Sequence, residues 1–148
     1  MNHAGNRTQT AARVVLGLLF AVFGLNGFLG FIPQPPHGGE AGAFLGALAA
    51  TGYMFPLIKG TELIAGLLLL SNRAVPLALT LLAPVVVNIV AFHAFLEPAS
   101  LAIPIVALAL GLYLAWTERT AFAPLFASRS SKQQTTHAPS GGHAGATA

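Results

Sequence analysis

The chain has 148 residues, of which 55% are hydrophobic and 7% are charged, and its mean hydropathy is +0.72. Soluble domains carry roughly 25% charged residues, so this composition excludes an ordinary water-facing surface and indicates a membrane protein. The net charge of +3 comes from basic residues spread over loops and tails, which excludes a basic face for nucleic acid.

Four apolar runs are long enough, or nearly so, to cross a hydrocarbon core of ~30 Å, which takes about 20 helical residues. They cover residues 14–32, about 53–70, about 75–96 and about 101–116. The sequence therefore predicts an all-α, integral membrane four-helix bundle. We divide the chain into a cytoplasmic N-terminal segment, 1–13, a four-span membrane domain, 14–126, and a disordered cytoplasmic tail, 127–148.

The first run resembles a retained span rather than a cleaved signal peptide. It is longer than the apolar core of about 7–15 residues that signal peptides have, and no small-x-small cleavage site follows it. Gly17, Ala21 and Gly24 recur at helical spacing within it. Such a stripe of small residues predicts close packing against another helix.

A shorter apolar stretch, residues 41–52, lies between the first and second spans and is too short to cross the bilayer. Gly42, Gly46 and Ala50 recur every four residues, which favours close contact with a neighbouring helix. We predict a short interfacial or re-entrant helix packed on the bundle. The alternative is an extension of the second span that bends at Gly52.

The basic residues predict the orientation. Six of the seven fall on one side of the four-span arrangement: Arg7, Arg13, Arg73, Arg119, Arg129 and Lys132. The loops on the other side carry only Glu40 and Glu97. The positive-inside rule then predicts a multi-pass protein of the bacterial inner (plasma) membrane with both termini in the cytoplasm.

Lys59 and Glu62 are the only formal charges inside the four apolar runs. A charge at mid-bilayer costs about 2.5–3.5 kcal/mol on insertion scales, so such residues usually have a partner or a function. At ~1.5 Å per residue, Lys59 lies about 8 Å and Glu62 about 12 Å below the outer boundary. Asn26, Asn88 and His93 fall at comparable depths. These five residues form the candidate intramembrane polar site.

Each of the five also has a structural interpretation. Lys59 can extend its stem to the outer interface, whereas Glu62 is too deep and must be paired, hydrogen-bonded or protonated. Lys59 precedes Glu62 and stands near the positive end of its helix, so an intrahelical salt bridge is the weaker explanation. We therefore expect partners for Glu62 from the first or third span.

The other three residues are also consistent with structural roles. Asn26 and Asn88 suit hydrogen bonds between helices, and His93 suits an interfacial position. Asn88 and His93 are about 140° apart around a helix, so they cannot both face the second span.

The residue types limit the cofactors. The absence of cysteine excludes disulfides, thiolate catalysis and iron–sulfur clusters. His93 is the only histidine inside an apolar run, so no bis-histidine haem is expected, and a bound quinone remains open. We interpret His3, His37, His137 and His143 as solvated side chains and predict no metal site.

Three segments resemble a known family. They are Gly17-Leu-Leu-Phe-x-x-x-Gly24-x-x-Gly27-Phe, Pro56-Leu-Ile-Lys-Gly-Thr-Glu62-Leu-Ile-Ala-Gly-Leu-Leu-Leu-Leu and Pro84-x-x-x-Asn88-x-x-x-Phe92-His93. Together they resemble the DoxX family of small four-helix bacterial membrane proteins, over roughly residues 14–126. The family takes its name from a subunit of a thiosulfate:quinone oxidoreductase, and some relatives are linked to oxidative-stress complexes. The resemblance implies no catalytic residues.

Three functions follow as hypotheses. The first is a non-catalytic accessory or assembly component of a membrane complex, which the resemblance suggests is a redox complex. The alternative is a quinone-binding oxidoreductase subunit in which Glu62 or His93 exchanges protons and Asn88 holds a carbonyl. The third is a transporter of a small solute or of protons. The partners considered are the lipid bilayer, other subunits of a complex and further copies of the chain.

Overall fold

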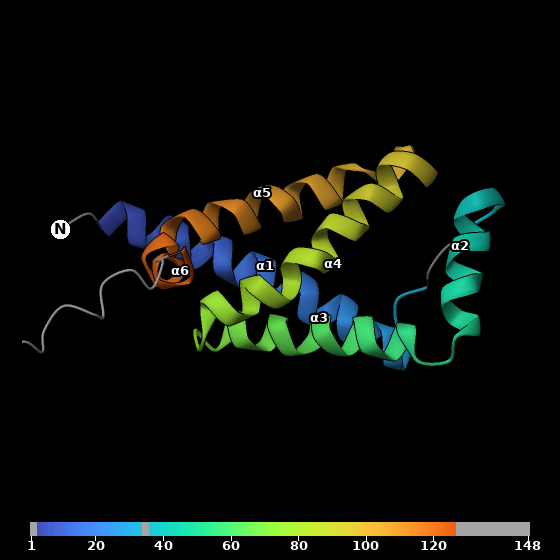
Figure 1. Ribbon diagram of the computed structural model, residues 1–148, viewed down its shortest axis with the longest axis horizontal. Helices are drawn as coiled ribbons and strands as arrows, with labels where there is room; N and C mark the ends of the chain where they lie inside the picture. Colours follow the sequence, from blue (N-terminus) through green and yellow to red (C-terminus); the bar gives the residue numbers. More distant parts are fainter. Residues whose placement is uncertain (1–2, 34–35, 127–148) are drawn as a thin grey trace, which may run out of the picture.

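The computed structural model describes residues 3–33 and 36–126, and all regular structure in these ranges is helical (Figure 1). The helices are α1 (His3–Leu29), α2 (Gly39–Ala50), α3 (Met54–Leu70), α4 (Val75–Leu96), the 3₁₀ helix η1 (Pro98–Ser100), α5 (Ala102–Thr117) and α6 (Arg119–Phe126). The all-α prediction is confirmed. The predicted tail, 127–148, lies outside the described residues.

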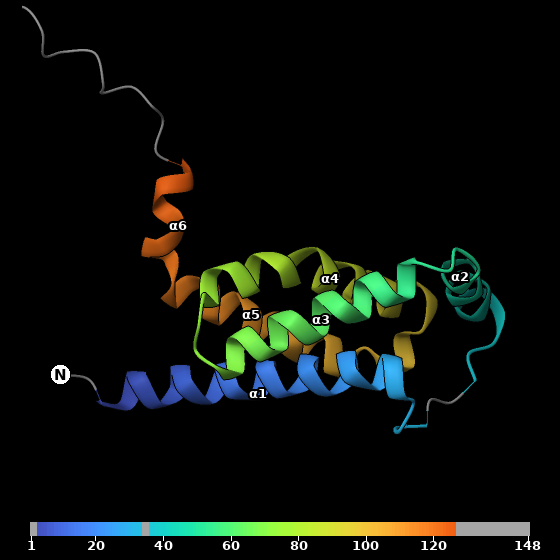
Figure 2. The ribbon, with the colours of Figure 1, turned by 90° about the horizontal axis from the view of Figure 1, so that it is seen from below.

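Most helix boundaries follow the predicted runs, and α1 is the main exception. It begins at His3, because residues 3–13 contain no proline and continue the helix beyond the apolar run. It ends at Leu29, since Gly30 takes a left-handed conformation (φ 62°) and donates its N–H to the Asn26 carbonyl at 2.8 Å. The α6 helix, which turns away from α5, was not predicted (Figure 2).

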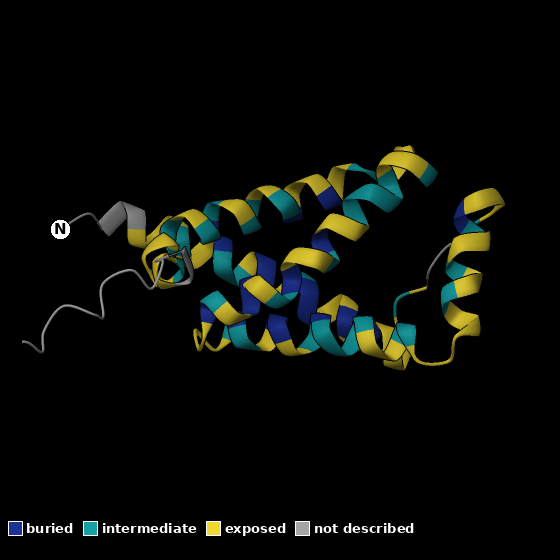
Figure 3. Cartoon of the chain, in the orientation of Figure 1, coloured by how far each residue is buried: buried dark blue, intermediate teal, exposed yellow. Residues whose placement is uncertain are grey.

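Four helices contact one another in a closed order. α1 lies along α3, α3 contacts α4, α4 contacts α5, and α5 returns to α1 (Figures 1 and 2). The cluster of buried core residues draws side chains from α1, α3, α4 and α5 (Figure 3). The largest apolar side chains that are almost fully buried are Leu16, Phe20, Leu69, Leu82 and Leu114.

Small residues set the close approach of α1 to α3. A β-carbon on Gly24 would lie 2.6 Å from the backbone nitrogen of Leu63, and one on Gly66 would meet the backbone of Ala21 and the carbonyl of Gly17. No side chain larger than hydrogen fits at either position without moving backbone. The predicted packing stripe on the first span is confirmed.

The α2 helix stands at 92° to α3, and the bend falls at Gly52, whose φ is +74°. The Phe44 ring of α2 contacts the Phe92 ring of α4, with centroids 5.7 Å apart. A β-carbon added at Gly46 would have no neighbouring atom within 4 Å, and Ala50 is exposed. The prediction that the small-residue stripe of α2 packs on the bundle is therefore wrong, since aromatic rings provide the contact.

Within the residues that the structure describes, two helices are long and apolar enough to cross a membrane: α1 over Asn6–Leu29, and α4. α2 and α3 add a third if the bent pair is one broken span. α5 is apolar but has only 16 residues. Length and composition thus indicate a membrane protein.

Candidate functional site

Lys59 and Glu62 form an ion pair on one face of α3. The Lys59 Nζ donates a hydrogen bond to Glu62 Oε2 at 2.8 Å. The Glu62 side chain is 2% exposed and that of Lys59 is 24% exposed. Lys59 is the only hydrogen-bonding partner of Glu62 within the described part of the chain.

This pair corrects two expectations. Lys59 does not extend away to the interface, and the partner of Glu62 comes from its own helix rather than from α1 or α4. A pair of opposite charges at this spacing stabilises an isolated helix by only about 0.2–0.5 kcal/mol, so the order of its two residues is a small effect. The attraction between charges ~4 Å apart is about 4 kcal/mol at an effective dielectric constant near 20. Attraction between the two charges therefore outweighs the unfavourable order.

Glycines of α1 form the wall beside the pair. A β-carbon on Gly27 would collide with the Cβ, Cγ and Cδ atoms of Lys59, and one on Gly24 would lie 3.0 Å from the Lys59 carbonyl oxygen. The stem of Lys59 thus occupies the space that Gly27 leaves open. This contact of Gly27 was not predicted, although its position three residues after Gly24 extends the same helical face.

Asn26 is buried, at 8% exposure, but its hydrogen bonds are local. Its Nδ2 donates to the Ile32 carbonyl at 3.2 Å, and its Oδ1 accepts from the Ile32 N–H at 2.6 Å. The amide therefore closes the turn after α1 rather than joining two helices. The interpretation that Asn26 forms a hydrogen bond between helices is wrong.

Asn88 and His93 of α4 are not hydrogen-bonded to the ion pair. Asn88 is exposed and has no hydrogen bond to the described chain. The His93 Nδ1 is 2.8 Å from the Ile89 carbonyl of its own helix, and its ring lies edge-on to Phe92. Of the five candidate residues, only Lys59 and Glu62 are joined by a hydrogen bond.

A second polar contact was not predicted. The His37 Nδ1 lies 2.9 Å from Glu97 Oε1, and the His37 ring contacts Phe92 edge-on with centroids 6.2 Å apart. The interpretation of His37 as a solvated side chain is therefore wrong. The two residues are 60 positions apart, so no local pattern could have paired them.

At the opposite end of the helices, polar side chains cap the end of α3 and connect α1 to the end of α5. The Arg13 guanidinium donates to the carbonyl of Leu69 and, at 3.3 Å, to that of Leu70, at the end of α3. Gln9 donates to Glu118 at 3.1 Å and so ties α1 to the end of α5.

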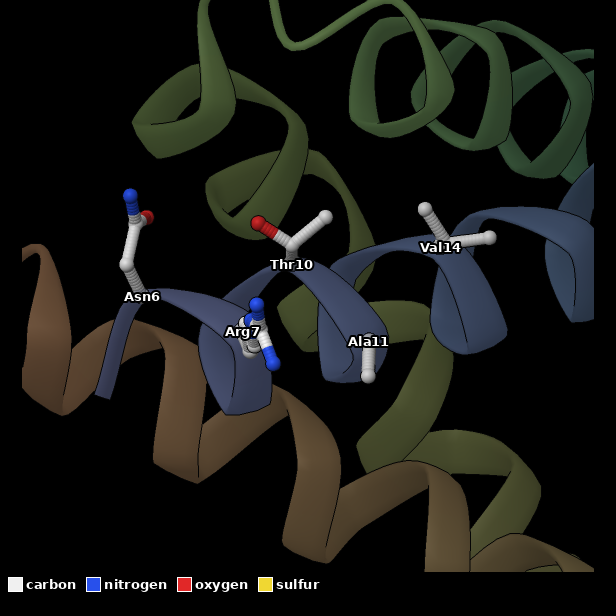
Figure 4. A pocket seen from close by; sticks show the side chains of 5 residues that line it. All are labelled: Asn6, Arg7, Thr10, Ala11 and Val14. Atoms are coloured by element: carbon white, nitrogen blue, oxygen red, sulfur yellow. The ribbon is translucent and has the colours of Figure 1, made fainter. Parts of the chain in front are cut away.

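A surface recess near this end is lined by α1 alone (Figure 4). Its residues are Asn6, Arg7, Thr10, Ala11 and Val14. It lies about two turns or more before Gly24 along α1, at a different level from the Lys59–Glu62 pair.

Within residues 3–33 and 36–126, no three His, Asp or Glu side chains are grouped so that they could hold a metal ion. His137 and His143 lie outside these ranges. Comparisons of the chain with protein-family models, with curated proteins and with solved structures find no match, so the resemblance to the DoxX family stands on the quoted motifs alone.

Proposed function

We propose that α1, α3, α4 and α5 each cross the bacterial inner membrane and that both termini are cytoplasmic. The start of α1, the turn between α3 and α4 and the end of α5 share one end of the molecule (Figure 1). Basic residues lie in or next to these segments, and the positive-inside rule places them in the cytoplasm: Arg7, Arg13, Arg73 and, directly after α5, Arg119. α3 and α5 are about 26 and 24 Å long, which a bilayer accommodates by local thinning.

Labelling of single cysteines tests this topology directly, because the chain has no native cysteine. Cysteines at Pro36 and Ser100 should react with a membrane-impermeant maleimide added outside spheroplasts. A cysteine at Asn72 should react only after permeabilisation. Labelling of Asn72→Cys from outside in intact spheroplasts would contradict the orientation.

We further propose that this DoxX-like protein is a non-catalytic accessory or assembly component of a membrane complex, without an enzymatic activity of its own. The observation that carries this proposal is the Lys59–Glu62 pair. Each charge is hydrogen-bonded to the other, and the Lys59 stem is packed against Gly27 of α1, so the pair suits a structural contact between α1 and α3. A reacting group would instead need access for a substrate.

Co-purification tests the accessory role. A tagged protein extracted from native membranes in several mild detergents should elute in assemblies that contain other polypeptides, identified by mass spectrometry. A Lys59→Met/Glu62→Met variant should still capture the same polypeptides, because it removes both charges but keeps the contact between α1 and α3 packed. Recovery of this chain alone in every detergent would contradict the proposal.

Quinone binding is the second candidate, and the position of the Glu62 carboxylate inside an apolar helix favours it. An ionisable side chain inside a membrane helix is a common proton-exchange site. The absence of a contact between Glu62 and His93 in the described chain makes this the weaker candidate. It predicts that quinone is extracted with the purified protein and is lost in Glu62→Gln. Protein that neither carries nor takes up quinone would exclude it.

A further inference from the structure

Asn88 differs from the other polar side chains of the apolar helices. It lies about 12 Å from Leu96, the nearer end of α4, and is exposed. In the described parts of α1 from Val14 onward, α3, α4 and α5, the other polar side chains are hydrogen-bonded, apart from Tyr113 and Trp116 near the end of α5. Asn88 is thus a deep amide with no hydrogen-bonding partner in the described part of the chain.

Other polar residues of α3 and α4 form a hydrogen bond within their own helix, which Asn88 does not form. Thr61, Thr80 and His93 each contact the carbonyl four residues earlier in their own helix, at 2.8 Å. Such a bond lets a polar side chain lie in hydrocarbon without another helix. Asn88 has no such bond, and its side chain is too short to reach either interface.

Hydrocarbon supplies no donor or acceptor, so an unpaired amide at this depth is costly. A hydrogen-bonding group on another membrane helix removes that cost. Polar side chains of this kind hold transmembrane helices together.

The surface around Asn88 permits another helix to approach. Ala83, Pro84 and Val87 are exposed and Ala91 is half-buried on the same stretch of α4. Val87 itself is 63% exposed. α3 and α5 are the long helices that pack on α4, and α4 lies on the side of the molecule opposite α1 (Figure 2). The face formed by these residues and Asn88, the Asn88 face, has no helix over it within the described chain.

We propose that the Asn88 face is the interface of a homodimer, in which Asn88 hydrogen-bonds to its counterpart in a second copy. The side-chain amide carries both donors and an acceptor, so it is complementary to itself. A twofold axis along the membrane normal brings the same residue of two copies together at one depth. A different partner would need its own polar group at that depth. This inference requires that α4 crosses the membrane and does not rest on the accessory role.

Cross-linking of the purified full-length chain in liposomes tests the interface. Val87→Cys and Ala91→Cys should form disulfide-linked dimers on oxidation with copper phenanthroline. The matched control is Val106→Cys on α5, because Val106 is also largely exposed, at 53%. Cross-linking at Val106 equal to that at Val87 and Ala91, or none at the latter two, would overturn the proposal.

Replacement of Asn88 tests the hydrogen bond itself. In Asn88→Leu, the dimer dissociation constant, measured by energy transfer as the protein is diluted in lipid, should rise about 3- to 30-fold. Asn88→Gln keeps the amide and should recover most of the affinity. Because Asn88 is exposed in the single chain, Asn88→Leu should keep its helical circular dichroism spectrum.

An unchanged dissociation constant in Asn88→Leu would overturn the proposal. So would cross-linking of Val87→Cys in native membranes to a different polypeptide in place of a second copy. Because the dimer is measured with purified protein, its failure is independent of whether other polypeptides co-purify with the chain.

Discussion

The stem of Lys59 lies against the backbone of Gly27, in the space that a β-carbon at position 27 would fill. This contact between α3 and α1 places the Lys59 ammonium beside the buried Glu62 carboxylate. The lack of a side chain at Gly27 of α1 therefore helps determine the position of the Lys59 ammonium of α3.

Adding a methyl group at the glycines between α1 and α3 should destabilise the protein. Gly27→Ala displaces the Lys59 stem, and Gly24→Ala presses on the backbone of Leu63. Each should lower the free energy of unfolding by about 1–3 kcal/mol, with Gly24→Ala the larger because backbone yields less than a side chain. Thermal unfolding in dodecyl maltoside measures the effect.

Gly60→Ala is the matched control, because a β-carbon there would have open space around it. It should be neutral or stabilising by up to about 1 kcal/mol, since alanine favours a helix over glycine. A loss of stability at Gly60 equal to that at Gly24 would contradict the packing argument.

Removing one member of the ion pair should cost more than removing both. Lys59→Met leaves a buried carboxylate without its partner, and the loss should lie near the lower end of about 3–5 kcal/mol, since Lys59 is partly exposed. Glu62→Met should cost less, because Lys59 can then extend its stem toward the interface. The double variant should lie within about 1 kcal/mol of the native protein. Additive losses in equilibrium unfolding would show that the two charges are not coupled.

Arg13 should stabilise the end of α3 in addition to any effect on topology. Its guanidinium binds the carbonyls of Leu69 and Leu70 in the last turn of α3, where the carbonyls lack the usual partner four residues later; that of Leu69 also accepts the Asn72 N–H at 3.1 Å. Arg13→Met should lower stability by about 1–3 kcal/mol, as expected for a hydrogen bond to a charged group. Arg7→Met removes an equal charge from an exposed residue and should leave stability unchanged, provided that labelling shows the native topology in both variants.

The contact between His37 and Glu97 should hold α2 in place. His37→Ala removes this contact and the ring contact with Phe92, so amide hydrogen exchange in residues 39–50 should become several-fold faster. His93→Ala is the control, because the His93 imidazole is hydrogen-bonded only within α4. Equal acceleration in the two variants would contradict the role given to His37.

Local pattern was enough to predict α3, α4 and α5, but it missed α6 and the polar contacts. Apolar runs and their breaks gave α4 at its observed ends and α3 and α5 within a residue, because these signals lie in adjacent residues. The stripe of Gly17, Ala21 and Gly24 correctly predicted close packing of the first span. Asn26 was misread, since its partner at Ile32 depends on how the chain turns after α1.

By itself, the sequence determined an all-helical, strongly apolar chain with two charges in the second apolar run, because composition and spacing are properties of neighbouring residues. Only the tertiary structure decided how those charges are accommodated. The gap at Gly27 lies on another helix, and it is this gap that lets the stem of Lys59 pack inward so that its ammonium meets Glu62. The same holds for Asn88, whose exposure depends on which faces of α4 are covered by α3 and α5. Contacts between distant segments determine the position of Lys59 and the exposure of Asn88, and no periodicity along the chain predicts such contacts.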